Sequence, residues 1–296
     1  MRIAVLSDIH GNPIALDAVL ADIEANGGAD EYLVLGDLVA IGYDPIAVLE
    51  RLTALPGVRF VEGNTDRYVV AGDRPFPSIE DAAGDHTLLA RLVEVAHTFA
   101  WTQGAITAAG WFDWLAALPA EQRLQLPDGT QVLGVHVAPG WSDGAGIHPK
   151  MTEDELRPLL AGVAADLVCV GHTHWPMDRR VAGIRVINTG SVSNPVALDL
   201  RASYALIDAR QSGYQVELRR VAYSCAAVID AVERSRHPSG DFIISHFRGQ
   251  RYPWWAGGAD GQEHAARAQL ITDAERGLQP RSAPGRSHGG DQSTRP

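Results

Sequence analysis

The chain has few cysteines and no long hydrophobic run, and each shortage excludes a class of protein. Its two cysteines, Cys169 and Cys225, lie far apart without a CxxC pattern, and Cys169 in the apolar run LVCV is expected to be a small buried hydrophobe. The N-terminal stretch MRIAVLSDIHG is too short and too polar for a signal peptide, and no later run reaches membrane-spanning length. These features predict a soluble, cytoplasmic protein.

Positive charge is also scarce. The 25 Lys and Arg residues against 36 Asp and Glu residues give a net charge of −11. Binding to a nucleic-acid backbone needs clustered Lys and Arg, so no broad nucleic-acid surface is expected. A small phosphorylated substrate stays compatible with this charge, because a bound metal would supply a local positive centre.

With 296 residues, of which 46% are hydrophobic, the chain can bury a substantial core. Buried strands are expected at 3–7, 32–35 and 58–61, and helices begin between them at Asn12-Pro13 and Asp44-Pro45. This alternation indicates right-handed βαβ units and an α/β fold. Each strand runs directly into a polar cluster, SDIHGN, GDLV or EGNTD. Sites in open α/β sheets lie outside the carboxyl ends of strands, so these clusters predict a site.

The rest of the chain divides into three parts. The pattern at 80–119 is helical and is interpreted as an inserted helical cap. Further strands follow, and those after GHTH are typical of a second, largely antiparallel sheet. The segment 279–296 is rich in Pro, Gly, Ser and Arg without periodicity and is predicted to be a disordered tail, which leaves 1–278 as the domain.

Polar side chains at the strand ends could ligate metal, and none of them is a thiolate. They are Asp8, His10, Asp37, Asn64, His136, His172 and His174. In the pairs DxH and HxH the side chains are two residues apart, so in extended backbone they share a face at a spacing of roughly 6–7 Å. Mixed nitrogen and oxygen ligands favour manganese, iron or zinc. Two histidines after a buried strand would be costly without partners.

Each motif taken singly has an ordinary structural explanation. A lone DxH is common, and Gly36-Asp37 alone is a turn. Asn64 in VEGNTDR is also explained by turn chemistry, and Asp66 is expected to brace that turn. The coincidence of five motifs, each after a buried strand, is what favours a site.

In this order the motifs resemble those of the calcineurin-like metallophosphoesterase family. They are D-x-H at 8–10, GD at 36–37, GN-x-D at 63–66, a histidine after a strand at His136, and GHTH at 171–174. The resemblance runs from residue 1 to about residue 208 and makes 1–278 a metallophosphoesterase domain. It implies a four-layer α/β/β/α sandwich of two mixed β-sheets flanked by helices.

The resemblance also implies a dinuclear metal centre. One implied ligand set comprises Asp8, His10 and His174, and the other comprises Asn64, His136 and His172, with Asp37 bridging both. Manganese is the metal expected in both positions, with iron, zinc, nickel and magnesium as alternatives. The implied reaction is in-line attack of a metal-bridging hydroxide on a phosphate ester, with Asp37, Asn64 and His136 at the catalytic centre.

Thr65 marks a departure from several branches of the family. GDLVAIG and GNTD stand where phosphoprotein phosphatases and dinucleoside tetraphosphate hydrolases carry GD-x-VDRG and GNHE, so a phosphate-clamping arginine and a catalytic histidine are absent. The pattern is most similar to the bacterial and archaeal YfcE-like phosphodiesterases. The missing histidine protonates the leaving oxygen, an effect worth roughly 10²–10⁴-fold. The enzyme is therefore expected to favour good leaving groups, or to take a proton from His86, His97 or His148.

Other functions stay open: a phosphomonoesterase, a protein phosphatase with a variant site, or a catalytically silent metal-binding scaffold. Retention of all seven ligand positions argues against the scaffold. Specificity is expected to lie in 80–119 and 138–150, and the tryptophans that could stack on a base are Trp101, Trp111, Trp114 and Trp141. Helical spacing makes the first three more typical of a core.

Overall fold

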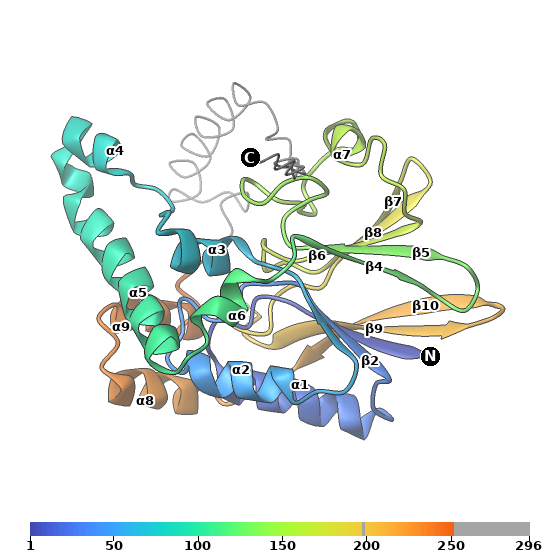
Figure 1. Ribbon diagram of the computed structural model, residues 1–296, viewed down its shortest axis with the longest axis horizontal. Helices are drawn as coiled ribbons and strands as arrows, with labels where there is room; N and C mark the ends of the chain where they lie inside the picture. The colour runs from blue at the N-terminus through green and yellow to red at the C-terminus, as the bar shows by residue number, and fades with distance from the viewer. Residues whose placement is uncertain (197–198, 252–296) are drawn as a thin grey trace, which may run out of the picture.

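The structure, a computed structural model, describes residues 1–196 and 199–251, and its strands form two five-stranded sheets (Figure 1). The first sheet contains β1 (Arg2–Leu6), β2 (Glu31–Val34), β3 (Val58–Phe60), β9 (Ala202–Arg210) and β10 (Gly213–Val221). The second contains β4 (Glu121–Gln125), β5 (Gln131–Val135), β6 (Leu167–Val170), β7 (Met177–Val181) and β8 (Ile184–Asn188). The strand orders are β10-β9-β1-β2-β3 and β4-β5-β6-β8-β7.

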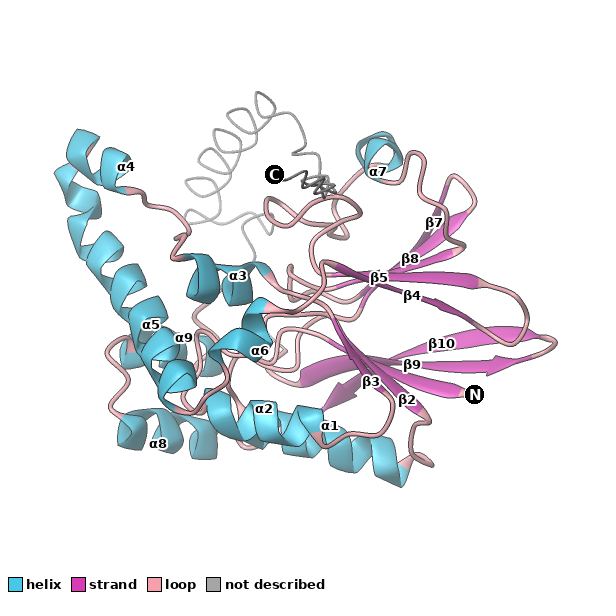
Figure 2. Cartoon of the chain, viewed as in Figure 1, coloured by secondary structure: helices cyan, strands magenta, loops and turns pink. Residues whose placement is uncertain are grey.

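Both sheets are mixed. Strands β1, β2 and β3 are parallel, as are β5, β6 and β8, while β9, β4 and β7 pair antiparallel with their neighbours. The helices are α1 (Pro13–Ala25), α2 (Pro45–Thr53), α3 (Asn64–Ala71), α4 (Ile79–Gly84), the 3-10 helix η1 (His86–Leu88), α5 (Leu89–Ala108), α6 (Phe112–Ala116), α7 (Glu153–Leu159), α8 (Cys225–Ser235) and α9 (Gly240–Phe247). The predicted fold of two mixed sheets flanked by helices is confirmed (Figure 2).

Successive side chains of a strand point to opposite faces of its sheet and so belong to different apolar clusters. In β1, Ile3 and Val5 belong to the apolar cluster between the two sheets, whereas Ala4 and Leu6 belong to the cluster that the first sheet forms with α1 and α2. A third cluster joins the outer face of the second sheet to α7. Cys169 on β6 is fully buried between the sheets, as predicted.

The first two helices begin immediately after the loops that follow β1 and β2. The Asn12 side chain accepts a hydrogen bond from the Ala15 N–H at 3.1 Å, and the Asp44 side chain accepts one from the Ala47 N–H at 3.1 Å. Both are the N-caps that the sequence predicts, each followed by proline at the first helical position. These caps set where the two helices begin, and therefore also where the loops that carry the polar residues end.

One expectation about the strands after GHTH was wrong. They do not form a sheet of their own, because β7 and β8 lie in the second sheet while β9 and β10 return to the first, where β9 pairs antiparallel with β1. At that junction the Arg2 guanidinium pairs with the Asp208 carboxylate at 2.7 Å. The apolar pattern of β9 indicates that the strand is buried, but it does not indicate which strand pairs with it.

The segment 80–119 is largely helical, as predicted. Its long helix α5 lies along one side of the molecule (Figure 1), and Phe99 on it packs edge-on against Tyr68 of α3, with ring centroids 5.5 Å apart. Trp111 and Trp114 pack against the same apolar cluster, which agrees with the core role favoured for them. The helical insertion is thus part of the core beside the first sheet.

The boundary of the domain at residue 278 and the disordered tail at 279–296 stay predictions, since both fall outside the described residues. None of the helices in the described part of the chain is long and apolar enough to cross a membrane.

Replacing Phe99 by alanine tests whether α5 belongs to the core. The side chain is 2% exposed, so Phe99→Ala is expected to lower the free energy of unfolding by about 3–5 kcal/mol. Urea denaturation followed by circular dichroism measures this loss. Val93→Ala on the same helix, where the side chain is 49% exposed, is the control and should change stability by about 0.5 kcal/mol or less. Equal midpoints for the two variants would contradict the packing.

Candidate metal centre

The structure brings all seven predicted residues to one edge of the sandwich, where parallel strands of both sheets end. Asp8 and His10 follow β1, Asp37 follows β2, Asn64 begins α3 after β3, His136 follows β5, and His172 and His174 follow β6. All are buried or nearly so. They form two groups of donors.

The first group consists of Asp8, His10, Asp37 and His174, each with a potential ligand atom within 4.8 Å of the others. His174 Nε2 lies 3.2 Å from Asp8 Oδ1 and 3.1 Å from His10 Nε2. His10 Nε2 in turn lies 3.7 Å from Asp37 Oδ2. The group coincides with the first predicted ligand set and the bridging aspartate.

The second group is built around the amide of Asn64. Its Oδ1 lies 2.9 Å from His136 Nε2 and 2.9 Å from His172 Nδ1. His136 Nε2 is also 3.3 Å from Asp37 Oδ1. One oxygen of Asp37 therefore faces each group, which is the arrangement that a bridging carboxylate requires.

Backbone carbonyls orient all four imidazole rings. The pairs are His10 Nδ1 with Ala40 O (2.9 Å), His136 Nδ1 with Leu35 O (2.6 Å), His174 Nδ1 with Asn194 O (2.7 Å) and His172 Nε2 with Gly144 O (2.8 Å). A carbonyl only accepts, so in the neutral ring the nitrogen against it carries the proton and the other nitrogen keeps its lone pair. In each ring that second nitrogen faces the site. This is the arrangement usual for metal-ligating histidines.

The backbone at the site is unusual. Five of the seven residues have positive φ angles between 47° and 69°, namely Asp8, His10, Asp37, His172 and His174. Such backbone in a residue with a side chain costs on the order of 1–3 kcal/mol and persists only where the surroundings impose it. Strained residues of this kind concentrate at functional sites, and here the strain turns side chains at the strand ends toward a common centre.

Two glycines let the strand ends approach one another. A Cβ atom at Gly63 would overlap the backbone nitrogen and the carboxylate of Asp37, and one at Gly171 would overlap the side chains of Ser7 and Asp8. No other amino acid fits at either place without moving a donor of the site. The glycines of GN and GHTH are therefore required by close packing.

The charges of the site suit a cation. Burial alone would raise the pKa of Asp8 and lower that of His136, but their partners reverse both shifts. His174 holds the pKa of Asp8 below its usual value, and Asp37 raises the pKa of His136 to about 10. Asp8 Oδ1 is buried and has no hydrogen-bond partner among the described residues. A buried carboxylate oxygen beside converging imidazole nitrogens fits a divalent metal such as manganese, iron or zinc.

Thr65 and Asp66, which follow Asn64, make different contacts. Asp66 accepts hydrogen bonds from the Leu38 N–H at 3.0 Å and the Gly63 N–H at 3.1 Å, so it braces the turn as predicted. The Thr65 N–H donates to Asp37 Oδ1 at 2.9 Å. The Thr65 hydroxyl is buried and has no hydrogen-bond partner in the described part of the chain.

The three histidines considered as alternative proton donors lie in different settings. His86 and His97 are exposed, on η1 and α5 respectively. His148 is buried, and burial lowers its pKa to about 4. An imidazole with that pKa is neutral at pH 7 and a poor donor.

The sequence reasoning missed Asp143. Its Oδ2 accepts hydrogen bonds from the Arg67 guanidinium at 2.8 Å and from the Tyr68 hydroxyl, and its Oδ1 accepts one from the Gly144 N–H at 2.8 Å. Because Gly144 also supplies the carbonyl that orients His172, Asp143 ties this loop to α3 and fixes the ring. The available signal was an Asp-Gly pair in the glycine-rich loop after a candidate ligand histidine.

The fold and the site together define the class of protein. Residues 1–212 match the family model for the calcineurin-like phosphoesterase superfamily domain. The chain therefore belongs to the calcineurin-like phosphoesterase superfamily.

Individual relatives cover most of the chain. The uncharacterized protein MJ0912 of Methanocaldococcus jannaschii is 29% identical over 255 residues, which are 80% of this chain and 93% of the relative. The solved structure of a metallophosphoesterase from Sphaerobacter thermophilus is similar with a TM-score of 0.65 and 25% identity, covering 84% of this chain and 99% of that one. The hypothetical protein PH1004 from Pyrococcus horikoshii OT3 shares the fold with a TM-score of 0.70, 22% identity and the same coverage of 84% and 99%.

Asp143→Asn tests the orienting network. Losing the carboxylate weakens the hold on Tyr68 and Arg67 and loosens the carbonyl that fixes His172. Affinity for a divalent metal is expected to fall about 10–100-fold, as for other outer partners of metal ligands. Metal analysis after equilibrium dialysis against buffered Mn²⁺ measures it. Asp73→Asn is the matched control, since Asp73 also pairs with Arg67 but is 54% exposed. Unchanged metal affinity in Asp143→Asn would contradict this role.

Proposed function

We propose that this protein is a metal-dependent phosphodiesterase. The observation that carries the proposal is that Asp37 lies between two groups of donors while a threonine follows Asn64. The two groups would hold two divalent ions, with manganese expected. When bound, such ions supply positive charge to phosphate oxygens and activate water for attack on phosphorus.

The protein's own residues set the charge of that centre. Asp8 and Asp37 contribute two negative charges, and the other five donors are neutral when they ligate metal. Two divalent ions would leave the site about two charges positive. This would attract a phosphate group into a protein whose net charge is −11. The carbonyl bonds to the imidazoles hold the donors in place, so little rearrangement accompanies binding.

Thr65 supports a preference for esters that need no proton donor. Its hydroxyl cannot protonate a leaving oxygen near neutral pH, but a buried hydroxyl without a partner can donate a hydrogen bond to a substrate oxygen. The similarity of GNTD to the YfcE-like pattern favours a diester over a monoester as substrate.

The first experiment compares bis-p-nitrophenyl phosphate with p-nitrophenyl phosphate on protein loaded with Mn²⁺ and analysed for metal content. The diester is expected to turn over faster. Asp37→Asn should lose the activity, because this variant removes the charge that both donor groups share. Faster turnover of the monoester, or of phosphopeptides, would favour a monoesterase or a protein phosphatase. No turnover with two metals bound would favour a silent scaffold.

The second experiment measures hydrolysis of aryl methyl phosphodiesters against the pKa of the leaving phenol. A steep dependence is expected, because no group at the Thr65 position protonates the leaving oxygen. Thr65→His should flatten the slope and speed up hydrolysis of the esters with the poorest leaving groups by about 10-fold or more. A native general acid contributes roughly 10²–10⁴-fold, so an introduced histidine is expected to give a smaller gain. Thr65→Val is the control and should keep the slope. A flat dependence in the unmodified protein would contradict the missing-acid hypothesis.

A further inference from the structure

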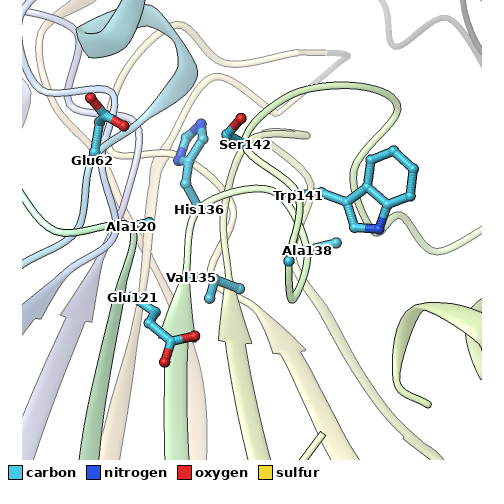
Figure 3. Close-up of a pocket in the computed structure, with 9 residues that line it drawn as sticks. Glu62, Ala120, Glu121, Val135, His136, Ala138, Trp141 and Ser142 are labelled. Atoms are coloured by element: carbon cyan, nitrogen blue, oxygen red, sulfur yellow. The ribbon is translucent and has the colours of Figure 1, made fainter. Parts of the chain in front are cut away.

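The two donor groups differ in what surrounds them. The second group borders a cavity of about 180 Å³, and His136 forms part of the cavity wall (Figure 3). The described residues that line this cavity include no member of the first group. Behind the first group lie instead the loop after β2 and the loop after β8, which supply the carbonyls that orient His10 and His174. What holds these two loops in place therefore decides how the first group is arranged.

Both loops have strained backbone at the orienting carbonyls. Ala40 accepts from His10, and the neighbouring Ile41 has a φ angle of 62°. Asn194, which accepts from His174, has a φ angle of 47°. The loops are also joined, because the Asn194 side-chain amide donates to the Ile41 carbonyl at 3.0 Å. A β-branched residue with positive φ is an outlier that persists only where its surroundings impose it.

Helices α8 and α9 form part of those surroundings. Their apolar side chains make one buried cluster, and Ile41 packs against it. Both helices follow residue 212, at which the family match ends. The buried members of the cluster are Val228, Val232, Ile243, Ile244 and Phe247. The first donor group is thus supported by a part of the chain that the family model does not include.

His246 on α9 is a buried histidine in this support. It is 9% exposed, and neither ring nitrogen has a well-formed hydrogen bond in the described part of the chain. Burial lowers its pKa well below the usual value, so the ring is neutral at pH 7 with one N–H and one lone pair. His174, Arg251 and His10 lower this pKa further, whereas the Pro195 carbonyl raises it. These influences place the ring near the first donor group and beside the Pro195 carbonyl.

We propose that His246 is a positioning residue for His174. Its N–H holds the carbonyl of Pro195, and this fixes the preceding carbonyl, that of Asn194, to which His174 donates. A buried N–H is costly without an acceptor, and Pro195 is the acceptor beside it. Phe242 packs edge-on against the His246 ring with centroids 5.5 Å apart, which limits its rotation. The inference rests on the proposed metal-dependent function and adds a residue that supports its site.

The first test measures metal affinity by equilibrium dialysis against buffered Mn²⁺. His246→Phe keeps an aromatic ring and removes both nitrogens, so affinity is expected to fall about 10-fold, the low end for outer partners of metal ligands. His246→Gln keeps an N–H and should restore most of it. His237→Phe is the matched control and should leave affinity unchanged. His237 is 5% exposed with an unpartnered Nε2, like His246, but burial alone lowers its pKa, to about 4.

The second test needs no bound metal. Long-range ¹H–¹⁵N NMR spectra of the metal-free protein, recorded at a pH where the rings are neutral, show which nitrogen of His174 carries the proton. The Nδ1–H form is expected in the unmodified protein and in His237→Phe, and a mixture of both forms in His246→Phe. A general loss of stability would not move this proton. If His246→Phe does not fold, His246→Met, which also lacks an N–H, takes its place in both tests.

The outcomes separate this inference from the proposed function. In a protein that binds Mn²⁺, unchanged affinity or an unchanged His174 proton in His246→Phe would overturn the positioning role. Equal losses of affinity in His246→Phe, His246→Gln and His237→Phe would show a general packing effect and would overturn it as well. If the unmodified protein binds no divalent metal, the proposed function fails and the NMR comparison decides alone. A proton that moves in His246→Phe and stays in His237→Phe then supports the role, and one that stays in both rejects it.

Discussion

The Asp37 carboxylate faces both groups of donors, with Oδ2 3.7 Å from His10 Nε2 and Oδ1 3.3 Å from His136 Nε2. This position requires strands of different sheets to end at the same place, because His10 follows β1 and His136 follows β5. The sandwich provides that meeting point, since the cluster between the sheets sets their distance and the parallel strands bring their carboxyl ends together. A buried carboxylate between imidazoles also suits the site to a cation.

The left-handed backbone at the strand ends has a cost that neighbouring hydrogen bonds offset. The Asp8 N–H donates to the Gly36 carbonyl at 3.0 Å, and the His10 N–H donates to the Asp37 carbonyl at 2.9 Å. The loops after β1 and β2 therefore continue the pairing of their strands, although their residues no longer have extended backbone. These backbone N–H groups in the strained turns are hydrogen-bonded, and the sandwich beneath the turns keeps their backbone conformation in place. Rigid placement of this kind is what a preorganised site needs.

The sequence predicted which side chains gather at one edge better than it predicted the membership of the sheets. The proximity of the seven candidate ligands could be predicted because strand ends share an edge, so a motif after each buried strand implies proximity even when the pairing of the strands is unknown. The position of β9 in the first sheet could not be predicted, because its apolar pattern would be the same whether it paired with β1 or with another buried strand. The role of Asp143 was not predicted, for a different reason. Its role depends on how a glycine-rich loop folds against α3, and that conformation has no periodic signature.

The scarcity of positive charge has a further consequence for substrate choice. A polyanion approaching the proposed metal centre would meet the carboxylates of Glu62 and Glu121 directly beyond it, and no clustered basic surface is predicted to hold its remaining phosphates. A substrate with one phosphate would approach the proposed ions without further phosphates for these carboxylates to repel. The acidic protein and the proposed cationic centre would thus act together, because the net charge that is expected to disfavour long nucleic acids would leave the attraction for a single phosphate intact.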